Sequence, residues 1–112
     1  MATRKGTIDF VLQRLGLPDR FSVRAMFGEY AVYADGKVVA FVCDDQLFVK
    51  ILPSSVALEK HCEKAEPFPG AKLYYLVTED QLSSLRTLPD LLIAMAATLP
   101  APKKRRAKGA RS

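Results

Sequence analysis

The sequence predicts an α+β fold with two layers, in which a mainly antiparallel five-stranded sheet carries helices on one of its faces. Three observations lead to this prediction. Apolar residues recur with helical spacing near both ends of the chain, and the segment between them alternates with the period of a strand. Strands and helices also do not take turns along the chain, as they would in a parallel sheet. The length of 112 residues suits one domain.

Residues 7–16 are predicted to form the first helix. Gly16 suits the position just after the last turn, and Pro18 prevents the helix from continuing. The apolar stripe of this helix follows the i, i+3, i+4, i+7 pattern and consists of Ile8, Val11, Leu12 and Leu15.

Four strands joined by short turns are predicted between residues 22 and 51. Asp35-Gly36 is a strong hairpin signal, because a two-residue type I′ turn needs positive φ at both positions. Asp44-Asp45 is a further turn, where aspartate is favoured because its side chain bonds the nearby backbone. The predicted strands are residues 23–27, 30–34, 37–43 and 46–51.

A second helix is predicted to begin at Pro53, which suits the first turn, and to run to about Cys62. Two prolines and a glycine at residues 66–70 then predict a loop. Residues 73–77 form the fifth predicted strand.

The last part of the chain is predicted to be helical. Thr78 and Gln81 match a capping box at the start of a short helix. Pro89 opens a further helix, whose apolar stripe ends near Leu99. The predicted order is therefore one helix, four strands, a helix, a strand and helical segments at the end.

The positive charge of the chain is concentrated at its C-terminus. We expect a domain over residues 1–100 and a disordered basic tail over residues 101–112. Of the 17 basic residues, six lie in the tail, which leaves 11 against 12 acidic residues in the domain. The domain is therefore nearly neutral, and only the tail suggests weak, salt-sensitive contact with nucleic acid, with a purely solubilising role as the alternative. The basic tail residues are Lys103, Lys104, Arg105, Arg106, Lys108 and Arg111.

No catalytic or metal-binding pattern emerges from the residue types and their spacing. His61 is the only histidine, and no nucleophile motif accompanies it. Cys43 and Cys62 match no zinc spacing, and together with His61 they supply fewer ligands than a closed structural zinc site requires. We therefore expect no enzyme, no cofactor and no metal ion, with both cysteines as free thiols.

Aromatic residues on the predicted strands suggest a contact surface. Tyr30, Tyr33 and Tyr75 are the candidate interface residues. Neighbouring strand residues face opposite sides of a sheet, so either Tyr74 or Tyr75 must leave the core side.

Residues 24–37 carry a family resemblance. They include Met26-Phe27-Gly28 followed by Tyr30, and they end in the Asp35-Gly36 turn. This stretch resembles the N-terminal domain of the TfoX/Sxy competence regulators, although Glu29 and Ala31 stand where these proteins usually have glycines. The resemblance implies an α+β fold like that of type III secretion chaperones. It also implies a non-enzymatic role beside a transcription activator.

The sequence thus leads to the hypothesis of a regulatory or adaptor protein, a single-domain member of that family, that binds a protein partner. No apolar run is long enough to cross a membrane and no secretory signal is visible, so we expect a cytoplasmic location. The sequence leaves open whether the protein forms a homodimer. The alternative function is a small-ligand-binding domain that uses the aromatic face of the sheet.

Overall fold

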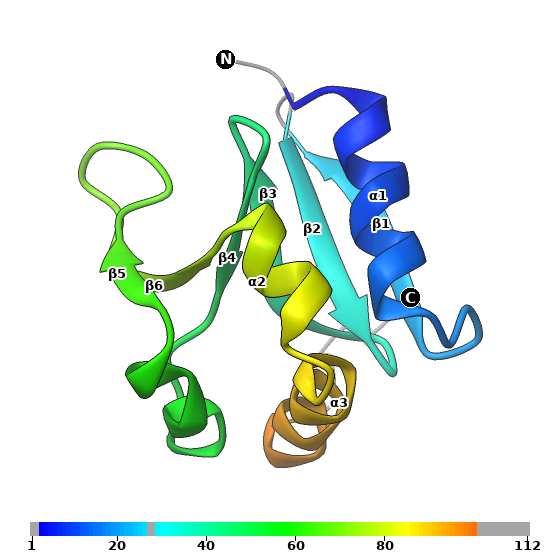
Figure 1. The fold of residues 1–112 in the computed structure, drawn as a ribbon, viewed down its shortest axis with the longest axis vertical. Helices are drawn as coiled ribbons and strands as arrows, with labels where there is room; N and C mark the ends of the chain where they lie inside the picture. Colours follow the sequence, from blue (N-terminus) through cyan, green and yellow to red (C-terminus); the bar gives the residue numbers. More distant parts are fainter. Residues whose placement is uncertain (1–2, 27–28, 101–112) are drawn as a thin grey trace, which may run out of the picture.

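A computed structural model describes residues 3–26 and 29–100 of the chain. All neighbouring strands of its sheet are antiparallel, in the order β1-β2-β3-β4-β6-β5 (Figure 1). The strands are β1 (Phe21–Met26), β2 (Glu29–Ala34), β3 (Lys37–Cys43), β4 (Gln46–Val49), β5 (Glu63–Ala65) and β6 (Tyr74–Val77). The helices are α1 (Lys5–Leu15), the 3₁₀ helix η1 (Pro53–Lys60), α2 (Glu79–Ser84) and α3 (Leu88–Thr98). No helix within the described residues is long and apolar enough to cross a membrane.

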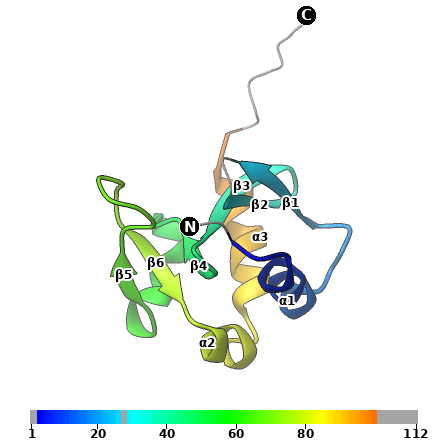
Figure 2. The same cartoon turned by 90° about the horizontal axis from the view of Figure 1, so that it is seen from above.

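The helices lie on one side of the sheet, which confirms the predicted α+β class (Figures 1 and 2). One large apolar core joins this side of the sheet to α1, η1, α2 and α3. We call this side the helix-covered face. Its strand residues include Val32, Val42, Leu47, Val49, Tyr75 and Val77, each at most 2% exposed.

The prediction of five strands was wrong, because residues 3–26 and 29–100 already form a sheet of six. Strand β5 (Glu63–Ala65) pairs with β6 at one edge of the sheet. Its sequence, Glu-Lys-Ala, has no apolar alternation and is only three residues long, so it lacks the period by which a strand is recognised. Its strand conformation comes from pairing with β6 rather than from its own residues.

The predicted second helix is present as the 3₁₀ helix η1, which begins at Pro53 as predicted and ends at Lys60. The hydroxyl of Ser55 donates to the carbonyl oxygens of Lys50 and Leu52, and the Leu52 N–H donates to Ser55 Oγ. These bonds tie the first turn to the end of β4, and the Ser55 N–H makes the i→i+3 backbone bond of a 3₁₀ helix to the Leu52 carbonyl at 2.9 Å.

Two hairpin turns use left-handed backbone conformations. Asp35 and Gly36 have φ values of 50° and 81°, which confirms the predicted hairpin. Asp44 and Asp45 have φ values of 52° and 62°, so the second turn adopts the same unusual conformation without a glycine. Aspartate tolerates this region better than most residues do, and tertiary contacts of Asp45 hold it there.

Residues of these turns also fix the ends of two helices. Helix α1 has no acidic residue in its first turn, but Asp45 accepts hydrogen bonds from the Arg4 N–H at 2.8 Å and from Thr7 Oγ1 at 2.8 Å. Helix α3 has no basic residue in its last turn, but Lys37 Nζ donates to the carbonyl oxygens of Ala96 and Leu99, each at 3.0 Å. Each charge has the sign that the helix dipole favours at that end.

Candidate binding face

The opposite side of the sheet, which we call the helix-free face, carries a second and smaller apolar cluster. Strand alternation places every second side chain of β2, β3, β4 and β6 on this side. The cluster is centred on buried Cys43, Phe48 and Tyr74, with Phe41, Ala65 and Leu76 packed around them. No helix covers this cluster in the described part of the chain, and the segment between β5 and β6 brings Pro67 and Phe68 beside it.

A pocket of about 520 Å³ opens on the helix-free face. Its floor is aromatic, because Phe41 and Tyr74 meet edge to face with ring centroids 5.7 Å apart. Its walls expose large apolar side chains, since Met26 is 41% and Phe68 60% exposed. The lining residues are Met26, Glu29, Phe41, Cys43, Pro67, Phe68 and Tyr74.

Positive charges surround the aromatic residues of this face. The Arg24 guanidinium lies 5.7 Å from the centroid of the Tyr33 ring, and Lys72 Nζ lies 6.0 Å from that of Tyr74. Burial, with a contribution from the nearby charge of Lys72, lowers the pKa of Lys50. Within residues 3–26 and 29–100, none of the three basic residues Arg24, Lys50 and Lys72 forms an ion pair.

Glu29 lines the pocket, but its carboxylate is engaged elsewhere. Its Oε1 accepts hydrogen bonds from the Thr3 hydroxyl and from the Asp44 N–H, the latter at 3.2 Å. Thr3 also bonds the Asp45 N–H and the Val42 carbonyl. Glu29 therefore ties the segment before α1 to the β3–β4 turn, a role that the sequence did not suggest.

The cysteines are free and buried, as the sequence predicts. Burial raises the pKa of the Cys43 thiol, and Glu29 and Asp44 add to this effect. Burial also raises the pKa of Cys62, whose thiol donates to Gln81 Oε1 at 3.7 Å. Burial therefore favours the neutral thiol form of both groups, which is the less nucleophilic form.

The three predicted interface tyrosines do not form one surface. Tyr30 packs against the helix-covered core, whereas Tyr33 stacks with Arg24 on the helix-free face. Tyr75 is 1% exposed, and its hydroxyl donates to Glu59 Oε1 at 3.0 Å. Tyr74 is the residue of the pair that leaves the core side, as alternation predicts for one of them.

The predicted interface residues included neither Phe41 nor Phe68. Phe41 is one of several aromatic residues on the strands, and its residue type alone does not distinguish core packing from contact on a sheet face. Phe68 lies between two prolines in a loop, where no periodic pattern shows which side chain it approaches. The predicted basic contact residues at positions 101–112 fall outside the described residues.

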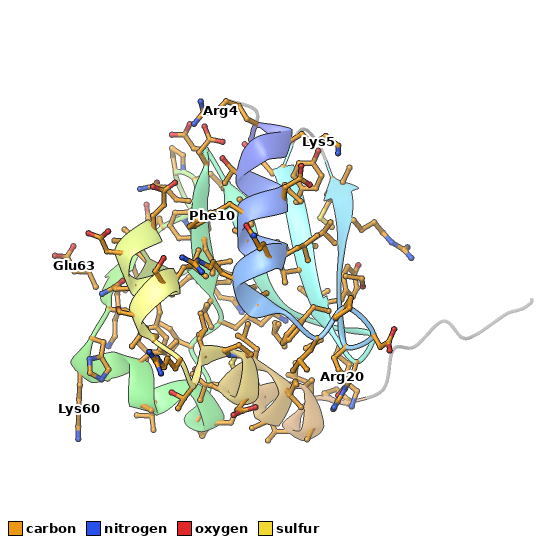
Figure 3. The ribbon with its side chains drawn as sticks, turned by 45° about the vertical axis from the view of Figure 1, so that its right-hand side comes forward. Arg4, Lys5, Phe10, Arg20, Lys60 and Glu63 are labelled. Carbon is orange, nitrogen blue, oxygen red and sulfur yellow. The ribbon has the colours of Figure 1, made fainter. Side chains whose placement is uncertain are left out.

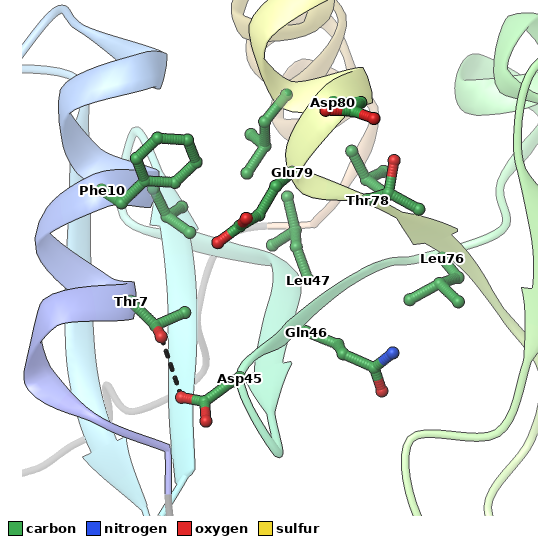
Figure 4. A pocket seen from close by; sticks show the side chains of 12 residues that line it. Thr7, Phe10, Asp45, Gln46, Leu47, Leu76, Thr78, Glu79 and Asp80 are labelled. Carbon is green, nitrogen blue, oxygen red and sulfur yellow. Dashed lines mark hydrogen bonds between the residues drawn. The ribbon is translucent and has the colours of Figure 1, made fainter.

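A second cavity, of about 330 Å³, lies between α1 and α2 (Figure 4). Its acidic side chains are Asp45, Glu79 and Asp80, and Asp45 accepts hydrogen bonds from Thr7 and Arg4. No group of three His, Cys, Asp or Glu side chains in the described ranges is arranged to hold a metal ion. The exposed His61 caps the C-terminal end of η1. It follows Lys60, whose side chain projects outward from the domain (Figure 3).

Comparison with known proteins decides the family. Residues 12–97 match the TfoX N-terminal domain. The chain belongs to this family. A protein of Spirochaeta aurantia, described as an uncharacterised 12.7 kDa protein in the trpE 5′ region, is 42% identical over 108 residues, which cover 96% of this chain and 93% of the relative. The family resemblance that the sequence predicted is thus confirmed for the TfoX N-terminal domain.

Proposed function

We propose that this TfoX N-terminal domain is a non-enzymatic regulatory or adaptor module of the cytoplasm that binds a protein partner through its helix-free face. The observation that carries the proposal is the open apolar pocket between the sheet and the Pro67-Phe68 segment, with Met26 and Phe68 exposed at its walls. Exposed apolar groups gathered around a cavity are typical of interaction sites, whereas single exposed apolar residues are not.

The chemistry of the face defines the partner. Methionine, aromatic residues and arginine are the types that protein interfaces favour, and this face presents all of them. Lys50 and Lys72 lie close to each other and form no ion pair within the described residues. The partner that fits is a protein segment with an apolar or aromatic side chain for the pocket and an acidic group beside it. A transcription activator, as the family resemblance implies, is the class of partner we propose.

Charge placed at the pocket wall tests this function. We expect Phe68→Asp to abolish capture of the partner from cell extract, because the aromatic contact is lost and the new carboxylate repels the acidic group of the partner. Val56→Asp is the matched control, since Val56 is an apolar residue of similar exposure, 62%, on η1. Captured proteins are compared by mass spectrometry with and without nuclease. An identical set of proteins for wild type and Phe68→Asp would overturn the proposal.

The basic tail is tested separately. If residues 101–112 contact nucleic acid, their deletion removes the nuclease-sensitive part of the captured material and leaves the Phe68-dependent part. Unchanged capture after the deletion would show that the tail serves only solubility.

A small apolar ligand is the second candidate for the pocket. Its volume of about 520 Å³ lies within the roughly 300–1,000 Å³ range of small-molecule sites, and its lining is mostly apolar. A thermal-shift screen over metabolites and nucleotides tests this function. A stabilising compound that no longer acts on Phe41→Ala would support it, and a screen without any such compound would argue against it.

A further inference from the structure

The two edges of the sheet differ in how well they are protected against pairing with another strand. Strand β5 has three residues, of which Glu63 and Lys64 are charged and exposed, and Pro67 follows it closely. Such short, charged edges are a common protection against strand addition. Strand β1 has six residues with Arg24 as its only charge, contains no proline, and is paired without a bulge.

The hydrogen-bond pattern shows which groups of β1 point outward. The Asp35 N–H donates to the Arg20 carbonyl at 2.8 Å, so these opposed residues form a hydrogen-bonded pair. Hydrogen-bonded and non-bonded pairs alternate along an antiparallel ladder. Phe21, Val23 and Ala25 are therefore opposite β2 in non-bonded pairs, and their backbone groups point away from the sheet.

These outward groups have few partners within the described residues. The Phe21 N–H bonds the Leu17 carbonyl at 3.3 Å. No described residue bonds the N–H of Val23 or of Ala25 from the outer side. The outer edge of β1 therefore offers the N–H groups of Val23 and Ala25 as donors and the carbonyl oxygens of Phe21, Val23 and Ala25 as acceptors.

We propose that a second copy of this chain pairs with β1 edge to edge, related by a twofold axis at Val23, which joins the two sheets into one. In this register Val23 exchanges both backbone hydrogen bonds with Val23 of the copy. The N–H of Ala25 meets the carbonyl of Phe21 of the copy, whose own N–H is already bonded within its chain. Every outward N–H of Val23 and Ala25 thus gains an acceptor.

Charge selects this register over its neighbour. An axis at Arg24 would also pair outward groups, but it would place the two arginines directly opposite each other, which is unfavourable across a strand pair. With the axis at Val23, Arg24 faces Ser22 of the copy. The chain's own basic tail is a poorer occupant of this edge, because it would bring its lysines and arginines next to Arg20 and Arg24.

Apolar surface beside the edge supplies further contact area. A cavity of about 420 Å³ between α1 and the start of β1 is lined in part by Leu12, Pro18 and Phe21, and Leu17 next to it is 47% exposed. In the proposed register Phe21 lies opposite the small residue Ala25 of the copy, which leaves room for its ring. This inference does not depend on the function proposed for the helix-free face.

The mass of the full chain in solution tests the proposal. We expect light scattering to give about twice 12.4 kDa for the wild type and about 12.4 kDa for Val23→Pro. Proline removes the central outward N–H without removing a bond to β2, and it is tolerated at sheet edges. Circular dichroism checks that this variant keeps its fold. A wild type that stays monomeric at every concentration up to its solubility limit would overturn the proposal.

A cysteine cross-link tests the register and does not require the proline variant to fold. Opposed Cα atoms of a hydrogen-bonded pair are about 5.5 Å apart, within the disulfide range. We expect Val23→Cys to form covalent dimers under mild oxidation, whereas Glu63→Cys on the other edge and the wild type, with its buried cysteines, do not. A cross-link through Glu63→Cys or Arg24→Cys instead of Val23→Cys would show that a different edge or register is used and would overturn the proposal.

Discussion

The two faces of the sheet are built from the same strands but have different surroundings. On the helix-covered face, side chains from three α-helices and η1 reduce the exposure of the core residues nearly to zero. On the helix-free face, a few aromatic residues pack against one another and leave a pocket open. The same period-two alternation therefore supplies stability on one side and an accessible surface on the other. Substitutions on the two faces should separate these two properties.

The largest expected effect is the loss of a core side chain on the helix-covered face. Leu92 of α3 is 0% exposed. We expect Leu92→Ala to lower the free energy of unfolding by about 2–5 kcal/mol, because it removes buried methyl groups and leaves a cavity. Urea denaturation followed by circular dichroism measures this change. Leu73→Ala is the control, since Leu73 is 50% exposed and should cost less than about 0.5 kcal/mol. Equal losses for the two variants would contradict the assignment of the core.

Substitution of the two adjacent tyrosines of β6 compares the stability contributions of the two faces directly. Tyr75 points into the helix-covered core, and its hydroxyl bonds Glu59, whereas no hydrogen bond of the Tyr74 hydroxyl is found among the described residues. We expect Tyr75→Phe to cost about 1 kcal/mol and Tyr74→Phe close to nothing. The same denaturation measurement distinguishes them. A greater loss for Tyr74→Phe would show that the two side chains have been assigned to the wrong faces.

The C-terminus of α3 gives the next smaller effect. Lys37 of β3 bonds the last carbonyl groups of this helix, which carries no basic residue of its own there. We expect Lys37→Met to lower stability by about 0.3–1 kcal/mol, because the charge and its hydrogen bonds are lost while most of the aliphatic length is kept. Lys60→Met is the control, since Lys60 is exposed (Figure 3). Equal effects of the two variants would argue against a specific helix cap.

These helix ends show what the sequence could and could not predict. The hairpin at Asp35-Gly36 and the capping box of Thr78 and Gln81 were predicted correctly, because each depends on residues that are close together in the chain. The bonds of Asp45 to Arg4 join residues 41 positions apart, and those of Lys37 to α3 span about 60. No local pattern contains such contacts, so their roles emerged only from the fold.

The candidate site also depends on contacts between residues that are far apart in the chain, so the sequence predicted it only in part. Alternation predicted that Tyr74 or Tyr75 would leave the core side, but not which one, because this depends on the register with β4 and β5. The pocket depends on where the Pro67-Phe68 segment lies beside the sheet, and a loop has no period from which this position follows. Strand β5 was missed because its residues favour a strand only when β6 lies beside them.

Asp45, at the N-terminus of α1, is expected to make the stability of the domain depend on pH. The N–H of Arg4 and the hydroxyl of Thr7, with the Arg4 charge, hold the pKa of Asp45 below its ordinary value of 3.8. A carboxyl group with a lowered folded-state pKa contributes stability that is complete above its unfolded value and is lost as the pH falls through the folded value. We expect Asp45→Asn to be less stable than the wild type at pH 7 and to show a smaller further loss below about pH 4. Urea midpoints from pH 7 to pH 3 test this, and parallel curves for the two proteins would contradict it.

The smallest expected change in stability is at the pocket wall of the helix-free face. Phe68 is 60% exposed, so most of its ring is already in contact with water. We expect Phe68→Ala to change the free energy of unfolding by less than about 0.5 kcal/mol, while it weakens binding of the partner at least about tenfold, as truncation of a central aromatic contact does. Denaturation and titration of the captured partner measure the two quantities on the same protein. Leu92→Ala should give the opposite result at temperatures where it stays folded, with large destabilisation and unchanged affinity. A Phe68→Ala variant that loses stability and affinity together would show that the Pro67-Phe68 segment belongs to the core, and the distinction between the two faces would then fail.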